Sequence, residues 1–277
     1  MTVESKQNYQ LKGNPVIVNV PVIGNLVYDD LGQEVLAQFN ERFKGTSIAD
    51  TNRYKQGEVI SYSNIPRALG YNQILREISN LRVLSPLEVV RFWDSIPERS
   101  STYADTDSVA VYPNEGANED LRKRALDING INAKKLKTPL IIAGLGVEKA
   151  DNKYGFDFVE TDYMKAEEAP FLSKDGNVRY EDGKLIESED GIRLWTLDSQ
   201  SGLRRLYRSR SDWLSAYRID LVLSDGSGRV QVIQEPKARV ENLEALAQKL
   251  KEEKEQDVAR IESNYQKALK VLKTGKL

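Results

Sequence analysis

The sequence predicts a mixed α+β fold built from three successive parts. An α/β domain is expected over residues 14–150, because a strand–helix–strand pattern at 108–147 predicts a βαβ unit. An antiparallel β domain, a meander forming a small barrel or sandwich, is expected over 155–235, where Asp-Gly and Ser-Gly pairs separate short alternating runs. A long helix is expected over 236–277, and the polar residues 1–13 are predicted to be loose.

The first part begins with extended structure followed by a helix. Residues 15–30 are rich in β-branched side chains and predict a strand that is interrupted by proline and glycine. Apolar residues at helical spacing then predict a helix over 31–43, which ends before Gly45. The segment 57–62, with the sequence GEVISY, predicts a short strand.

A pair of helices follows in the sequence. The first is expected over 64–81 from its apolar spacing, although a glycine weakens its middle. The second is expected over 85–96 and opens with a capping box, in which Ser85 is the N-cap and Glu88 lies three residues later. A proline at the first helical position supports this start.

The predicted βαβ unit has strands at 108–113 and 138–147 and a helix at 118–128. Such a unit requires parallel strands joined by a right-handed crossover. The continuous apolar run LIIAGL in the second strand is typical of a strand buried on both faces.

In the β domain, the turn pairs predict hairpins between short strands. Asp-Gly occurs at 175–176, 182–183, 190–191 and 225–226. Period-two alternation places five apolar residues on one core face: Trp213, Tyr217, Ile219, Leu221 and Leu223. The arginines of the preceding segment are then expected on the outside of the meander.

The C-terminal part has an apolar stripe at three- and four-residue spacing. Its members are Val240, Leu243, Ala247, Leu250, Val258, Ile261, Tyr265, Ala268 and Leu272. A helix of about 35 residues would be about 50 Å long, which is too long to be covered by a compact domain of this size. The stripe therefore predicts a coiled coil or partner-binding helix, and a non-enzymatic assembly protein. The alternative is a hairpin with a break near Gln256.

Composition excludes several classes of chemistry. The chain has 277 residues with 40 basic and 42 acidic side chains, and it contains no cysteine or histidine. Disulfides, cysteine–histidine zinc sites and histidine bases are thereby excluded, and no cofactor is expected unless magnesium serves a carboxylate site. No signal peptide or membrane span is evident, which predicts a cytoplasmic protein.

A basic–aromatic segment suggests a nucleic-acid-binding alternative, because arginines can contact phosphates while aromatic rings stack on bases. The segment runs from Arg204 to Arg218. After strand alternation is considered, the candidate contacts are Arg204, Arg205, Tyr207, Arg208 and Arg210.

A third alternative is a magnesium-dependent nuclease. Asp220 lies within a strand, and Glu235 and Lys237 follow the next strand. This order resembles the Asp…Glu-x-Lys core of the restriction-endonuclease-like nucleases. The resemblance implies that the two acids bind magnesium and that the lysine helps to activate water.

Weaker patterns complete the set of candidates. Glu160 and Asp162 share one face of a strand and could bind a cation, or pair with arginines. Gly144 and Gly146 follow a buried strand and indicate a tight turn. The loop 114–116 follows a predicted parallel strand, a position where α/β domains place ligands, and its alternative role is helix capping.

Overall fold

The computed structural model describes residues 21–97, 101–196, 201–211, 213–234 and 251. Most of them belong to one compact unit that runs from Pro21 to Glu235. The expected C-terminal helix, with its apolar stripe, and the N-terminal residues 1–13 lie outside the described residues. Within the described part, no helix combines the length and the apolar character that crossing a bilayer requires.

The described residues of this unit form four α-helices and fourteen strands. The helices are α1 (Asp30–Arg42), α2 (Ile65–Ile78), α3 (Pro86–Arg91) and α4 (Glu119–Ile128), with 3-10 turns at Trp93–Ser95, Ala133–Lys135 and Pro170–Ser173. The strands are β1 (Val22–Asn25), β2 (Leu81–Val83), β3 (Tyr103–Val111), β4 (Leu140–Ala143), β5 (Gly146–Lys149), β6 (Phe156–Val159), β7 (Lys165–Glu168), β8 (Gly176–Glu181), β9 (Lys184–Ser188), β10 (Ile192–Trp195), β11 (Leu203–Arg208), β12 (Leu214–Ser215), β13 (Gly228–Arg229) and β14 (Gln231–Gln234).

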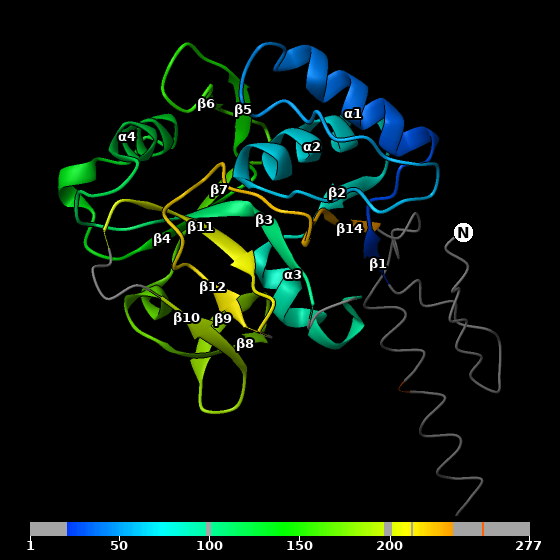
Figure 1. The fold of residues 1–277 in the computed structure, drawn as a ribbon. Helices are drawn as coiled ribbons and strands as arrows, with labels where there is room; N and C mark the ends of the chain where they lie inside the picture. The colour runs from blue at the N-terminus through cyan, green and yellow to red at the C-terminus, as the bar shows by residue number, and fades with distance from the viewer. Residues whose placement is uncertain (1–20, 98–100, 197–200, 212, 235–250, 252–277) are drawn as a thin grey trace, which may run out of the picture. The chain divides into compact units, whose positions relative to one another are not determined.

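A curled nine-stranded sheet, shaped like a half-barrel, organises the unit (Figure 1). Its strand order is β7-β4-β3-β11-β12-β10-β8-β9, and β13 pairs with β3. A three-stranded sheet, β1-β14-β2, and the β5-β6 hairpin complete the β structure. The mixed α+β class is therefore confirmed. The large sheet contains strands from both expected domains, 14–150 and 155–235. These two ranges therefore do not form separate sheets.

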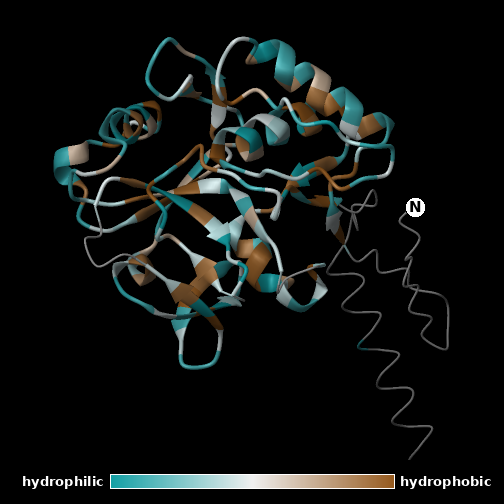
Figure 2. Ribbon diagram, viewed as in Figure 1, coloured by the Kyte–Doolittle hydropathy of each residue, from teal (hydrophilic) through white to brown (hydrophobic). Residues whose placement is uncertain are grey.

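Two hydrophobic clusters lie on opposite faces of β3. Successive side chains of this strand point to alternate faces, so the strand contributes residues to both clusters. Val109 and Val111 belong to the first cluster, together with apolar residues of α1, α2 and α4. Ala110 and Tyr112 belong to the second, together with residues of α3, β8, β10 and β12. Hydrophobic residues lie on helices as well as on strands of the unit (Figure 2). Burial of each large apolar side chain contributes about 2 kcal/mol, so β3 is the structural centre of the unit.

Several locally encoded elements are confirmed. Helix α1 matches the range predicted from apolar spacing, and α4 matches the predicted 118–128 helix within one residue. At α3, the Glu88 N–H donates to Ser85 Oγ at 3.4 Å, and the Ser85 N–H donates to Glu88 Oε2 at 3.0 Å. Asp182 and Gly183, both with positive φ, connect β8 to β9 as a hairpin.

The predicted parallel βαβ unit is wrong. Strands β3 and β4 are antiparallel neighbours, with Val111 opposite Leu140 and Ser108 opposite Ala143. The chain leaves β3 at Val111, forms α4, and returns to the same end of the sheet before β4 begins. The helix therefore packs beside the strand ends, mainly against β6, and does not carry the chain across the sheet face.

Two other strand predictions also need correction. Residues 57–62 form only isolated bridges, through Val59 and Ser61, because they run between α1 and α2 at the edge of the small sheet. The second predicted strand is not buried on both faces. In β4, Leu140 and Ile142 are buried, whereas Ile141 and Ala143 are half-buried because they line a pocket.

The predicted core face of residues 213–223 is largely wrong. Tyr217, Ile219 and Leu223 are 45%, 49% and 52% exposed, whereas Leu221 is buried. Only Leu214–Ser215 forms a strand in this region. The following segment is held by side-chain hydrogen bonds from a buried arginine, so its side chains do not alternate between a core face and a solvent face.

Candidate functional site

A pocket opens over β3, β4 and β7, and we call it the Asp107 pocket. Its volume is about 720 Å³, within the range of about 300–1,000 Å³ that is common for small-molecule sites. Helices α2 and α3, strand β2 and the β8–β9 hairpin supply the other walls. The lining residues that matter chemically are Arg76, Arg82, Asp107, Tyr163, Lys165 and Glu167, and the apolar ones include Leu87, Ile141, Phe171 and Leu185.

Asp107 is the buried acid of this pocket and is only 4% exposed. Its backbone is fixed at both ends, since its N–H donates to the Leu84 carbonyl at 3.0 Å and its carbonyl accepts from the Gly144 N–H at 2.8 Å. Ser108 Oγ donates to Asp107 Oδ1 at 2.8 Å. No donor among the described residues reaches the other carboxyl oxygen.

The environment makes Asp107 a weak acid. Burial raises the pKa of Asp107 to about 6, and the hydrogen bond from Ser108 offsets only part of that rise. The nearby negative charge of Glu88 raises the pKa further. Near neutral pH this carboxyl can therefore both accept a proton from a bound molecule and return one to it.

The arginines of the pocket have different roles. Arg82 forms an ion pair with Glu88. Burial raises the pKa of Glu88, but the hydrogen bond and the positive charge of Arg82 outweigh burial and hold this pKa below its usual value. Arg76 instead lies over the ring of Tyr163, with its Cζ atom 4.1 Å from the ring centroid. Within the described residues Arg76 has no carboxylate ion-pair partner. Its positive charge is therefore available to a ligand.

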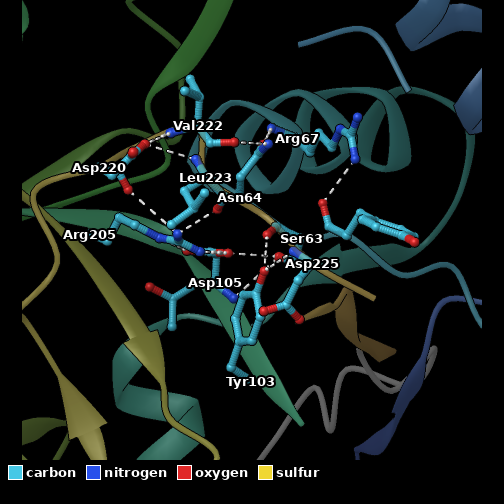
Figure 3. A network of polar contacts seen from close by, with 12 residues as sticks. Ser63, Asn64, Arg67, Tyr103, Asp105, Arg205, Asp220, Val222, Leu223 and Asp225 are labelled. Atoms are coloured by element: carbon cyan, nitrogen blue, oxygen red, sulfur yellow. Dashed lines mark hydrogen bonds and ion pairs between the residues drawn. The ribbon is translucent and has the colours of Figure 1, made fainter. Parts of the chain in front are cut away.

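Asp105, two residues earlier on β3, contrasts with Asp107 because its hydrogen bonds are satisfied within the protein (Figure 3). Arg205 Nε and Nη2 donate to its two oxygens, each at 2.8 Å, and Ser63 Oγ donates to Oδ2 at 2.9 Å. Arg205 Nη1 also donates to the Leu223 carbonyl at 2.7 Å. This buried network fixes the segment that precedes β13, and it leaves no free oxygen on Asp105.

A second, smaller pocket lies beside this network, and we call it the Arg218 pocket. Its volume is about 330 Å³. The residues that line it are Tyr103, Arg205, Tyr207, Ser209, Arg210, Ser211, Arg218, Leu223, Ser224 and Asp225. Three of the residues predicted to contact nucleic acid line this pocket, namely Arg205, Tyr207 and Arg210. Arg218, at the end of the same basic–aromatic segment, lines it as well.

The basic–aromatic candidates are only partly on the surface. Arg204, Arg205 and Arg208 are 2%, 4% and 0% exposed, so the expectation that they cover the outside of the sheet is wrong. Arg208, for example, donates from Nη1 to the Thr102 carbonyl and from Nη2 to Thr102 Oγ1, both at 2.8 Å. Arg210 is exposed and pairs with Asp225. The arginines are buried because each meets carbonyl or carboxylate acceptors inside the fold.

The acidic candidates do not form a site within the described part of the chain. Asp220 Oδ1 accepts from the Val222 N–H at 3.1 Å and the Leu223 N–H at 2.9 Å, so this acid stabilises a turn. Its proposed partners Glu235 and Lys237 lie outside the described residues. Glu160 and Asp162 are both exposed. Among the residues described, no group of three or more metal-ligating side chains is present.

The loop 114–116 supports β11 and contributes to neither of the two pockets described above. The Asn114 carbonyl accepts from the Gly202 N–H at 2.8 Å, and the Gly116 N–H donates to Glu119 Oε2 at 3.3 Å. The loop does not cap α4, because the N-cap residue is Asn118 and no side chain among the described residues caps this helix end. Gly144, with a φ of 69°, makes the tight turn between β4 and β5 that the sequence indicates.

Comparison of the chain with protein-family models, with curated proteins and with solved structures gives no match. Asp107 and Arg76 were not among the candidates predicted from sequence. The signal that could have found Asp107 is the run of polar residues at 105–108, which lies inside a fully buried strand.

Proposed function

We propose that this protein binds a small organic acid that carries an amine or hydroxyl group and an apolar side chain, and that it does so in the Asp107 pocket. The observation that carries the proposal is the Asp107 carboxyl, which lines the pocket from a buried residue and whose one side-chain donor among the described residues is Ser108, at Oδ1. A buried carboxyl normally has several hydrogen-bond donors, as Asp105 does on the same strand. A ligand that donates a hydrogen bond would supply what Asp107 lacks.

The other groups of the pocket support this ligand class. The Arg76 guanidinium can bind a carboxylate, because it has no ion-pair partner among the described residues. Burial raises the pKa of Tyr163 to about 12, so its hydroxyl stays protonated at neutral pH and can donate. Leu87, Ile141 and Leu185 provide apolar walls for the side chain of the ligand. Amino acids and hydroxy acids with aliphatic or aromatic side chains combine these features.

Binding should depend on Asp107. With a panel of apolar amino acids and hydroxy acids, titration calorimetry of the full chain should show binding that Asp107→Asn weakens about tenfold or more, since a hydrogen bond to a charged group contributes about 1.5–3 kcal/mol. Asp190→Asn is the matched control, because Asp190 is exposed and lies outside the pocket. Equal affinity for wild type and Asp107→Asn, or no binding by any member of the panel, would contradict the proposal.

The apolar stripe from Val240 to Leu272 supports a second proposal, namely that the protein self-associates or binds a partner protein through its C-terminal helix. Ending the chain before Pro236 should then lower the oligomeric mass measured by light scattering, or abolish capture of a partner. A full-length chain that is already monomeric and that co-purifies with no partner would count against this second proposal.

A further inference from the structure

We propose that the Arg218 pocket is a binding site for a phosphate ester with an attached planar ring, as found in a nucleotide or along a single nucleic-acid strand. The site is separate from the Asp107 pocket, since the two share no lining residue. The nucleic-acid-binding alternative is based on the whole segment from Arg204 to Arg218, whereas this proposal is limited to the side chains that line the pocket.

Among the described residues, the charges of the pocket leave the guanidinium of Arg218 without a carboxylate partner. Arg205 is paired with Asp105 inside the protein, and Arg210 is paired with Asp225. Arg218 is exposed and has no carboxylate ion-pair partner within the part of the chain that the structure describes. An anion bound in this pocket would therefore meet a net positive charge.

Hydroxyl groups around Arg218 suit a phosphate. Ser209, Ser211 and Ser224 line the pocket, as does Tyr207. A phosphate group offers several acceptor oxygens, and hydroxyl donors beside an arginine are the groups that commonly bind it. The pocket volume of about 330 Å³ also leaves space for more than the phosphate itself.

The surroundings of the pocket suit a planar ring. Tyr207 packs against Tyr103 with ring centroids 6.2 Å apart, and Arg205 Cζ lies 5.3 Å from the Tyr207 centroid. Leu223, at the pocket wall, is 52% exposed. Exposed aromatic and apolar side chains beside arginines are the elements on which bases stack in single-strand binding.

The pocket is also preorganised. The Arg205 N–H donates to the Arg218 carbonyl at 3.0 Å, while its guanidinium holds the carbonyl of Leu223. These bonds fix the backbone on both sides of Asp220, which itself caps the turn (Figure 3). A ligand would therefore not need to order this segment, and preorganisation of this kind favours affinity.

The test uses the full chain and two probes. Fluorescence anisotropy with a labelled single-stranded oligonucleotide and calorimetry with a nucleoside monophosphate should each be compared for wild type, Arg218→Ala and Arg218→Lys. Arg218→Ala should weaken binding about tenfold or more, and Arg218→Lys should retain part of the affinity because it retains the charge. Arg179→Ala, on the exposed surface of β8, is the control and should bind like wild type.

The outcomes distinguish the sources of the phosphate. Binding of the oligonucleotide alone, with an affinity that falls steeply as salt rises, assigns the pocket to a nucleic-acid strand. If the nucleoside monophosphate binds as strongly as the oligonucleotide, the pocket is assigned to a small ligand. No binding of either probe, or unchanged binding by Arg218→Ala, would overturn the proposal. Asp107→Asn should leave these affinities unchanged, which keeps this test independent of the Asp107 pocket.

Discussion

Replacement of Arg205 with alanine should lower the free energy of unfolding by about 3–5 kcal/mol. Arg205 and Asp105 form an ion pair whose side chains are 4% and 0% exposed (Figure 3). Without the guanidinium, the carboxylate would be buried with only the Ser63 hydroxyl as a side-chain donor. The carbonyl of Leu223 would also lose a donor, so the segment before β13 should loosen at the same time.

The measurement is urea unfolding of the full chain at neutral pH. Arg179→Ala is a matched control because its ion pair with Glu181 is about half exposed on each side, and exposed pairs contribute about 0–1 kcal/mol. If Arg205→Ala lowers the free energy of unfolding by no more than Arg179→Ala does, the network of Figure 3 does not hold the segment before β13 in place. Hydrogen exchange at Val222 and Leu223 would report the local loosening directly.

Replacement of Asp107 with asparagine should stabilise the protein by up to about 3 kcal/mol at pH 8 and by little at pH 4. Burial raises the pKa of Asp107 from 3.8 to about 6, and each tenfold difference in proton affinity corresponds to about 1.4 kcal/mol. At low pH the acid is neutral in both the folded and the unfolded chain. As the pH rises from about 4 to about 6, only the unfolded chain loses the proton, so the folded state becomes less stable.

Asparagine has the shape of the neutral acid but does not ionise, so the variant does not lose stability as the pH rises through this range. The difference in unfolding free energy between Asp107→Asn and wild type should therefore grow between pH 4 and pH 7, then remain constant. Asp190→Asn, at an exposed site, should change stability by no more than about 0.5 kcal/mol. A variant that is destabilised at every pH would mean that Asp107 is a structural acid like Asp105.

The parts of the fold that the sequence predicts correctly are those encoded by neighbouring residues. The capping box at Ser85 and Glu88 fixes the start of α3, and the apolar spacing of α1 fixes the side that it buries. Asp182 and Gly183 specify a turn that requires positive φ at both positions. Each of these signals lies within a few residues of the structure that it determines.

The parts that could not be predicted depend on distant partners. Arg205 is buried because Asp105, 100 residues earlier, lies beside it on β3. Without that partner in view, an arginine-rich strand is expected to be exposed. The antiparallel pairing of β3 and β4 likewise depends on where α4 packs, which local periodicity does not encode.

The candidate site was missed for a related reason. The strand was expected to begin at residue 108, where the apolar residues begin, whereas β3 begins at Tyr103 and includes both buried acids. Whether such an acid is structural or free to bind a ligand depends on the donors around it. Asp105 has its donors on β11 and near α2, and Asp107 faces a pocket.

The most direct test of the proposed ligand site is a carboxyl-carbon NMR titration of Asp107 in the full chain, with and without apolar amino acids or hydroxy acids. The structure predicts a pKa of about 6 for the free protein. An amino acid whose ammonium group binds there should lower that pKa, because the positive charge favours the carboxylate. A pKa near 3.8 that no member of the panel changes would contradict the proposal that Asp107 is the centre of a binding site.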